Sequence, residues 1–209
     1  MATSTTPSFE SALEEICSTT IAEAAPGVDR SGAFPAHSIE ALKSAGLLGA
    51  LSSAEQGGLG LGLAGATRIV RRIAEECGST AMVTAMHYSA VAVLETYAPA
   101  DIRREAASGT RLATLAFSEA GTRSHFWAPA GTAQANGDAV VLNAHKSWIT
   151  SASEASLYIW SSKPLGTEGL STLWLVPRST PGIQVKGPFE GMGFRGNDSS
   201  PVVGENVTV

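Results

Sequence analysis

The sequence predicts an α+β protein, in which an N-terminal all-α helical domain precedes a small antiparallel β-barrel or sandwich domain. The main observation is a change in the spacing of apolar residues near position 110. Before it, they recur every three or four residues, as in amphipathic helices; after it, they alternate, as in strands. The Asn136-Gly137-Asp138 sequence adds a strong hairpin signal. We therefore expect a helical domain at 1–110 and a β-domain at 111–209.

The helices of the first region are expected between the proline and glycine residues that start and stop them. The first has an apolar stripe from Phe9 to Ala24 and is predicted to end at Pro26-Gly27. A glycine-rich turn is expected at 55–60. The remaining helices are expected at 36–45, 66–77, 80–97 and 100–109. The helix at 80–97 is apolar on nearly all sides and should be buried.

The second region is expected to contain short strands separated by turn residues, a pattern typical of a small barrel or sandwich. The predicted strands lie at 112–117, 139–142, 157–161, 170–176, 183–186 and 202–209.

Composition excludes several classes of function. The 209 residues carry a net charge of −5, and the basic residues are scattered, so no nucleic-acid partner is expected. The longest apolar stretch, 81–94, is too short and too polar for a membrane span. The N-terminus lacks a signal-peptide pattern, and Cys17 and Cys77 are far apart in sequence. We expect a cytoplasmic protein with two reduced, buried thiols.

Common catalytic and metal-binding motifs are missing from the sequence. The four histidines have no metal-ligand spacing, so no metal site is predicted. The glycines at 57–62 do not follow a strand, which makes a dinucleotide-binding loop a poor interpretation. A connecting turn explains them better.

Two segments of the β-region are more informative. Residues 115–124 form a predicted strand that enters a loop of small hydroxyl residues, which offers backbone and side-chain donors in one place. Residues 146–150 place an indole beside a hydroxyl at a strand end. A flavin ring needs an aromatic wall and a few hydrogen-bond donors. Taken alone, Trp148 is better explained as a core residue, because a tryptophan in a β-domain is usually part of the core.

The order and separation of these segments resemble the acyl-CoA dehydrogenase family over essentially the whole chain. In the helical region the similar stretches are LKSAGLLG, AEQGGLGLG and RIAEECGSTAMVTAMH. In the β-region they are AFSEAGTRS, LNAHKSWITSASEASLYIW, STLWLVPRSTPGIQV and GMGFRGNDSSPVVGENVTV. Each motif is modest by itself, but their common order is specific.

The resemblance implies an FAD held by the β-domain and an oxidoreductase that dehydrogenates an acyl-CoA thioester in fatty acid or lipid metabolism. Trp148 would pack on the flavin ring, Thr150 would lie near its N5, and Ser124 would also approach the substrate. The cofactor-binding residues implied in this way are Leu115, Phe117, Ser118, Ser124, Trp148, Ile149 and Thr150. The implied partners are an acyl-CoA or related substrate, an electron-accepting flavoprotein or oxygen, and further subunits in a homo- or hetero-oligomer.

Departures from the family pattern leave alternatives open. Ala120 replaces a proline, and Arg123 and His125 flank Ser124 where other residues are usual. Arg123 could pair with a phosphate or face solvent, and His125 could transfer protons or be a surface residue. There are two alternative functions. One is a flavin monooxygenase of the same fold, for which Arg123, His125 and His87 are the reason. The other is a non-catalytic partner subunit.

No catalytic base is assigned within the chain. The family takes its glutamate base from a C-terminal helical domain, and no residue here matches that base; Glu119 is interpreted as structural. We expect the chain to lack that domain, and to expose apolar patches on the surfaces that the domain would cover.

Overall fold

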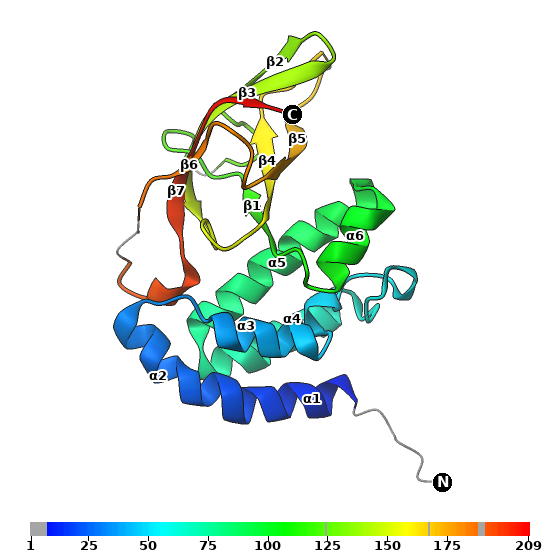
Figure 1. Cartoon of the computed structure of the whole chain (residues 1–209), viewed down its shortest axis with the longest axis vertical. Coiled ribbons are helices and arrows are strands. Elements are labelled where there is room, and N and C mark those ends of the chain that lie inside the picture. Colours follow the sequence, from blue (N-terminus) through cyan, green and yellow to red (C-terminus); the bar gives the residue numbers. More distant parts are fainter. Residues whose placement is uncertain (1–7, 124, 167, 188–190) are drawn as a thin grey trace.

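The computed structural model describes residues 8–123, 125–166, 168–187 and 191–209. Helices form one part of the molecule and strands the other (Figure 1). The helices are α1 (Phe9–Ile16), a π-helical turn (Cys17–Ile21), α2 (Ala22–Ser31), α3 (Ala36–Ser44), α4 (Gly62–Glu76), α5 (Gly78–Tyr97) and α6 (Ala100–Ala107). Short 3-10 turns lie at Leu47–Gly49, Ala54–Gln56 and Arg195–Asn197.

The strands form two open sheets, with orders β1-β4-β5 and β2-β3-β7-β6. Their bounds are β1 (Ala113–Ala116), β2 (Thr132–Asn136), β3 (Ala139–Ile149), β4 (Leu157–Ser162), β5 (Thr172–Pro177), β6 (Ile183–Val185) and β7 (Ser200–Thr208). The predicted α+β class is confirmed, and the β-part is a sandwich. Among the strands of the described ranges, β1 and β4 pair in parallel and the other pairs are antiparallel.

Strand β4 lies at the centre of the layers and is buried along its whole length. Tyr158 and Trp160 belong to the core between the two sheets. Leu157 and Ile159 point to the opposite face and join a cluster with Leu94 of α5. Alternate residues of one strand therefore bind the helical part and the second sheet together.

The first helices differ from the expectation at Pro26, which lies inside α2 and does not end it. Proline fixes φ near the helical value and removes one hydrogen bond, so a helix can accommodate it where surrounding contacts compensate. Val28 beyond it is buried in the helical core. The helix ends at Gly32, whose φ of 68° is a left-handed cap that glycine adopts without strain.

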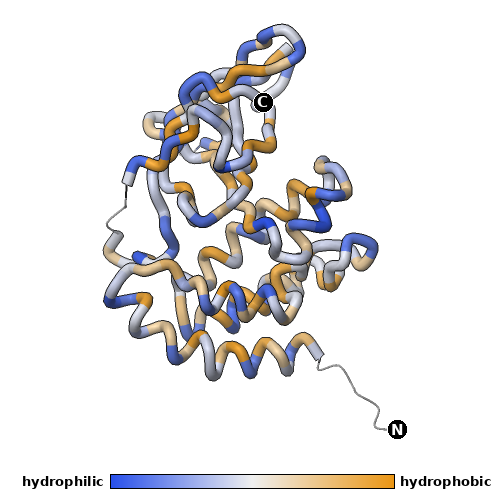
Figure 2. Tube along the Cα trace, viewed as in Figure 1, coloured by the Kyte–Doolittle hydropathy of each residue, from blue (hydrophilic) through white to orange (hydrophobic). Residues whose placement is uncertain are grey.

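One side of helix α1 and of the π-turn that follows it is buried. Along α1, orange hydrophobic stretches and blue hydrophilic stretches follow one another (Figure 2). Leu13, Cys17 and Ile21 are buried in one cluster with Ile69 and Ile73 of α4.

None of the helices in the described ranges is long and apolar enough to cross a membrane.

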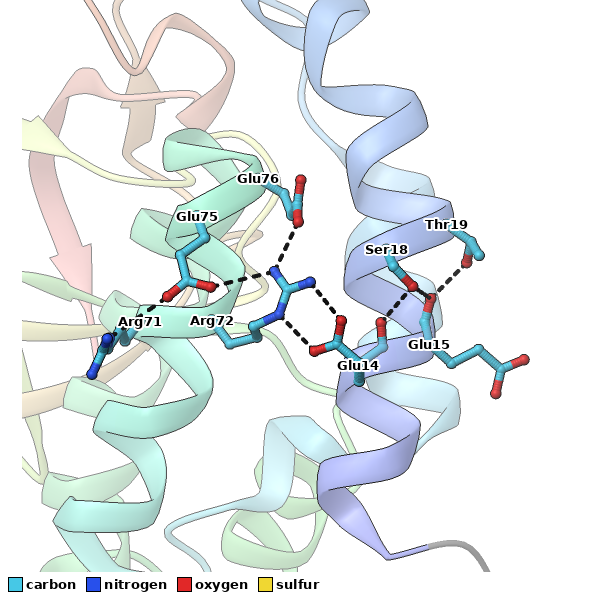
Figure 3. A network of polar contacts seen from close by, with 8 residues as sticks. All are labelled: Glu14, Glu15, Ser18, Thr19, Arg71, Arg72, Glu75 and Glu76. Carbon is cyan, nitrogen blue, oxygen red and sulfur yellow. Dashed lines mark hydrogen bonds and ion pairs between the residues drawn. The ribbon is translucent and has the colours of Figure 1, made fainter.

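Polar contacts around Arg72 of α4 connect this helix to α1 (Figure 3). Its Nε lies 2.8 Å from Glu14 Oε2, and its Nη2 lies 3.0 Å from Glu14 Oε1. Its Nη1 lies 2.9 Å from Glu76 Oε1. Because the guanidinium binds Glu14 with two parallel hydrogen bonds, the pair fixes the orientation of α1 as well as its position.

Replacing Arg72 with methionine should lower the melting temperature by about 2 °C, since a partly exposed ion-pair network contributes modestly to stability. Arg71→Met is the matched control, because the Arg71 side chain is 83% exposed and its Nε lies 3.6 Å from Glu75. Thermal unfolding at low and high salt measures both variants. Equal melting temperatures for the two variants, or a loss that high salt leaves unchanged, would contradict the role assigned to Arg72.

Candidate functional site

The loop that follows β1 meets the end of β3, which brings the two informative segments of the sequence together. Glu119 and Lys146 form an isolated antiparallel bridge. Next to it, the Ser147 N–H donates a hydrogen bond to the Ser118 carbonyl over 2.8 Å. Residues 117–119 and 146–148 are therefore neighbours in space.

A β-bulge sets the direction of Trp148. The pairing of β3 with β7 shifts register between Lys146 and Ile149, and Trp148 between them has a φ of 56°. A left-handed residue in a bulge turns its side chain away from the regular alternation. The indole is 55% exposed, so the bulge presents a large aromatic surface at the edge of the β-part. This conformation is strained for a non-glycine residue, and strained residues cluster at functional sites.

The two residues after Trp148 turn inward. Ile149 is 1% exposed, with its side chain in the core between the sheets, so only its backbone can face a ligand. Thr150 is also buried, and its Oγ1 lies 3.4 Å from Ser199 Oγ. The following turn is held by Asp198, whose carboxylate accepts the Ser153 N–H over 2.6 Å. The segment that precedes β7 thus holds the end of β3 and the turn after it through hydrogen bonds.

The other predicted cofactor residues lie on or just after β1. Leu115 and Phe117 are half-buried and pack against the cluster that faces α5. The Phe117 ring stacks on Phe126 with 6.4 Å between ring centroids. Ser118 is half-buried beside Ser147. Ser124, predicted to contact both cofactor and substrate, lies outside the described residues.

Arg123 and His125 are both exposed. Arg123 has a φ of 53°. His125 stacks on Trp127 at 4.8 Å, and Trp127 in turn meets the edge of Phe126 at 4.9 Å. The loop therefore carries a partly exposed cluster of rings between β1 and β2.

A buried ion pair beneath the loop is the feature that sequence reasoning missed. Lys146 Nζ lies 2.7 Å from Glu119 Oε1, and the two side chains are 0% and 2% exposed. Burial lowers the pKa of Lys146, and the hydrogen bond and charge of Glu119 oppose that effect. The available signal was a lysine at an inward-facing position of β3, in register with the buried Leu142 and Ala144.

His87 lies in the interior, away from any exposed surface. Its Nδ1 accepts the Ala113 N–H over 3.2 Å, which joins α5 to the start of β1. Burial lowers the pKa of His87 to about 4. The imidazole is therefore neutral at physiological pH, and its burial prevents direct contact with a ligand at the surface. In the described part of the chain, no group of three or more histidine, cysteine or acidic residues could hold a metal ion.

Comparison with known proteins places this fold. Residues 3–109 match the model of the acyl-CoA dehydrogenase N-terminal domain, and residues 114–207 match the model of the acyl-CoA dehydrogenase middle domain. The probable acyl-CoA dehydrogenase YngJ of Bacillus subtilis is 30% identical over 197 residues, covering 90% of this chain and 52% of its own length. The chain thus spans about half the length of the curated relatives it matches.

Solved structures agree on the fold. Butyryl-CoA dehydrogenase from Megasphaera elsdenii superimposes with a TM-score of 0.87 at 20% identity, covering 100% of this chain and 58% of that one. FMN-bound TdsC from Paenibacillus sp. A11-2 gives a TM-score of 0.84 at 24% identity, covering 96% and 52%.

Helices followed by a two-sheet sandwich give this chain the same fold as the solved acyl-CoA dehydrogenases. The two consecutive domain matches make the assignment specific. The chain belongs to the acyl-CoA dehydrogenase family.

Proposed function

We propose that the surface formed by residues 115–118 and 148–150 holds the flavin ring of an FAD-dependent acyl-CoA dehydrogenase. The single observation that carries the proposal is the bulge, which exposes the Trp148 indole beside the Ser118 carbonyl region. An aromatic wall flanked by hydroxyl and backbone donors fits a planar heteroaromatic ring. In this proposal residues 1–110 and 111–209 are separate domains, and the second binds the cofactor.

Bound FAD would supply a hydride acceptor for α,β-dehydrogenation of an acyl-CoA thioester. The residues of this chain would bind and orient the ring: Trp148 by stacking, and Ser118 and Thr150 through donors at its polar edge. Ser124 would also contact the substrate. We assign no proton-abstracting base to the chain. The base must face the flavin across the substrate, and none of the residues proposed here has that role.

An apolar groove supports the proposal that further helical structure or another subunit covers this half of an enzyme. The groove has a volume of about 500 Å³ and lies between the end of α5 and strands β4 and β5. Tyr97 and Leu173 on its walls are 80% and 39% exposed. Exposed apolar patches of this kind are typical of surfaces that associate. We propose a homo- or hetero-oligomer in the cytoplasm.

Flavin retention tests the proposal directly. The purified chain would be mixed with FAD or FMN, desalted, and examined for visible flavin absorption. Retention of FAD supports the proposal; preferential retention of FMN, the flavin bound in TdsC, would correct the cofactor. No retention of either flavin by the chain, alone or with a full-length family member, would contradict it.

The electron acceptor distinguishes the dehydrogenase from an oxygen-using monooxygenase of the same fold. An exposed cluster of rings beside Phe117 keeps the second candidate open, because it offers a planar surface for a substrate other than an acyl chain. Oxygen consumption by the reduced, flavin-loaded protein would favour the monooxygenase. Reduction of an electron-transferring flavoprotein by acyl-CoA would favour the dehydrogenase.

Trp148→Ala should weaken FAD binding by about tenfold or more, since it removes the aromatic wall. Leu63→Ala is the control: Leu63 is also a large apolar side chain, 74% exposed, and it lies on α4, outside the β-part. Titration of flavin fluorescence gives both dissociation constants. Equal constants for wild type and Trp148→Ala would remove Trp148 from the site.

A further inference from the structure

In the interior next to the proposed flavin surface, the ammonium group of Lys146 connects three segments of the chain. Lys146 Nζ of β3 lies 2.7 Å from Glu119 Oε1 in the loop. It also lies 2.7 Å from the Ser161 carbonyl and 2.9 Å from Ser161 Oγ on β4. The Trp160 ring centroid, 5.1 Å away, covers another side of the cation. The three donor positions of the lysine are thus directed at one carboxylate and one serine.

Glu119 extends this connection to the far end of the same loop. Its carboxylate accepts hydrogen bonds from the Ala130 and Gly131 N–H groups, where the chain enters β2. A Cβ at Gly131 would lie 2.8 Å from Glu119 Oε1, so the glycine allows the close approach. The loop from 119 to 131 is therefore closed by a single carboxylate that Lys146 holds in place.

We propose that Lys146 and Glu119 are positioning residues, whose buried contact holds the loop against the end of β3 and thereby sets the shape of the flavin surface. Each lies next to that surface in sequence: Glu119 follows Ser118, and Lys146 precedes Trp148 by two residues. The proposal rests on the proposed function, because it assigns the loop and Trp148 to flavin binding.

Stability alone is a weak reason for such a pair. Removing two charges from water is costly, and buried ion pairs can often be replaced by uncharged residues of similar shape without loss of stability. Uncharged residues cannot reproduce the whole set of contacts. The Glu119 carboxylate binds two loop amides, and Lys146 connects that carboxylate to Ser161 of β4. The geometry therefore points to a role in placing the loop.

The double variant Glu119→Gln with Lys146→Met tests this role, because it removes both charges and keeps both shapes. Its melting temperature should stay near that of the wild type. Its dissociation constant for FAD should rise about tenfold, and the Trp148-dependent quenching of flavin fluorescence should fall. The control is Glu105→Gln with Arg111→Met, an ion pair between α6 and the segment before β1.

Hydrogen exchange supplies a readout that needs no ligand. In the double variant, the amides of Gly131 and Ser147 should exchange about tenfold faster, while those in β4 and β5 keep their wild-type rates. Weaker FAD binding together with this local exchange supports the proposal. Wild-type affinity and spectrum in a folded double variant, or exchange that rises uniformly across the β-part, overturns it.

Failure of the proposed function is a separate result. If the wild type retains no flavin under any condition, the flavin assignment fails, and the exchange rates of Gly131 and Ser147 alone decide whether Lys146 and Glu119 hold the loop. If the double variant unfolds, Lys146→Met paired with Glu119→Leu replaces it, and the same two amides are compared with the wild type.

Discussion

Replacing Lys146 alone with methionine is expected to lower the free energy of unfolding by about 3–5 kcal/mol. The reason is that the buried carboxylate of Glu119 would lose its cation. Glu119 is 2% exposed, and in the variant its carboxylate would be buried with two amide donors and no cation. A loss of this size is a large fraction of the stability of an ordinary domain. Partial unfolding at physiological temperature should follow.

Urea unfolding followed by tryptophan fluorescence measures the effect. Lys43→Met is the control, because its Nζ lies 3.0 Å from Glu40 but the two side chains are 36% and 60% exposed, and its loss should cost less than about 0.5 kcal/mol. Adding Glu119→Gln to Lys146→Met should recover most of the stability. A single variant as stable as the Lys43 control would show that the carboxylate finds water or another partner.

The fold was largely predictable because local signals agree with the tertiary packing. The stops predicted at Gly46 and Gly109 are left-handed in the structure, with φ of 71° and 70°. The buried α5 and the hairpin around Gly137 follow in the same way from apolar content and turn chemistry. Pro26 was interpreted wrongly, because a local rule for proline was applied where burial of Val28 keeps the helix going.

The candidate site was predictable in part. Residue chemistry singled out the two segments, the resemblance implied their roles, and the structure brings them together at Ser118 and Ser147. The bulge at Trp148 could not be predicted, since it depends on how β3 pairs with the last strand, β7, where Ile149 lies opposite Ser200. The Lys146–Glu119 contact joins residues 27 positions apart, and no periodic pattern reports such a pair. Ile149, counted among the cofactor residues, has its side chain in the core.

Acidification is expected to destabilise the protein through His87. In the folded state burial lowers its pKa from 6.5 to about 4, because the charged imidazolium loses its hydration in the interior. The unfolded chain therefore binds more protons between those two values. Stability is fully present above pH 6.5 and is lost as pH falls toward 4. Between pH 6.5 and pH 4 the free energy of unfolding falls by about 3 kcal/mol, of which roughly 2 kcal/mol is lost by pH 5.

The contact made by Nδ1 shows which hydrogen bond protonation would break. In the neutral form this nitrogen accepts the Ala113 N–H, and a protonated Nδ1 would place two donors against each other. Ala113 begins β1, which leads into Phe117 and Ser118. Protonation of His87 should therefore loosen the junction between α5 and the strand that enters the proposed flavin surface.

His87→Asn separates this residue from the carboxylates that titrate in the same range. The asparagine oxygen can still accept from Ala113, and the amide that replaces the imidazole does not titrate. We expect it to be less stable than wild type at pH 7, because the smaller side chain leaves a cavity, but to lose less stability on acidification. Urea unfolding at intervals from pH 7 to pH 4 gives the two curves. His37→Asn, at an exposed position of α3, should keep the wild-type profile. Parallel curves for wild type and His87→Asn would mean that His87 is not the group that makes the fold sensitive to acid.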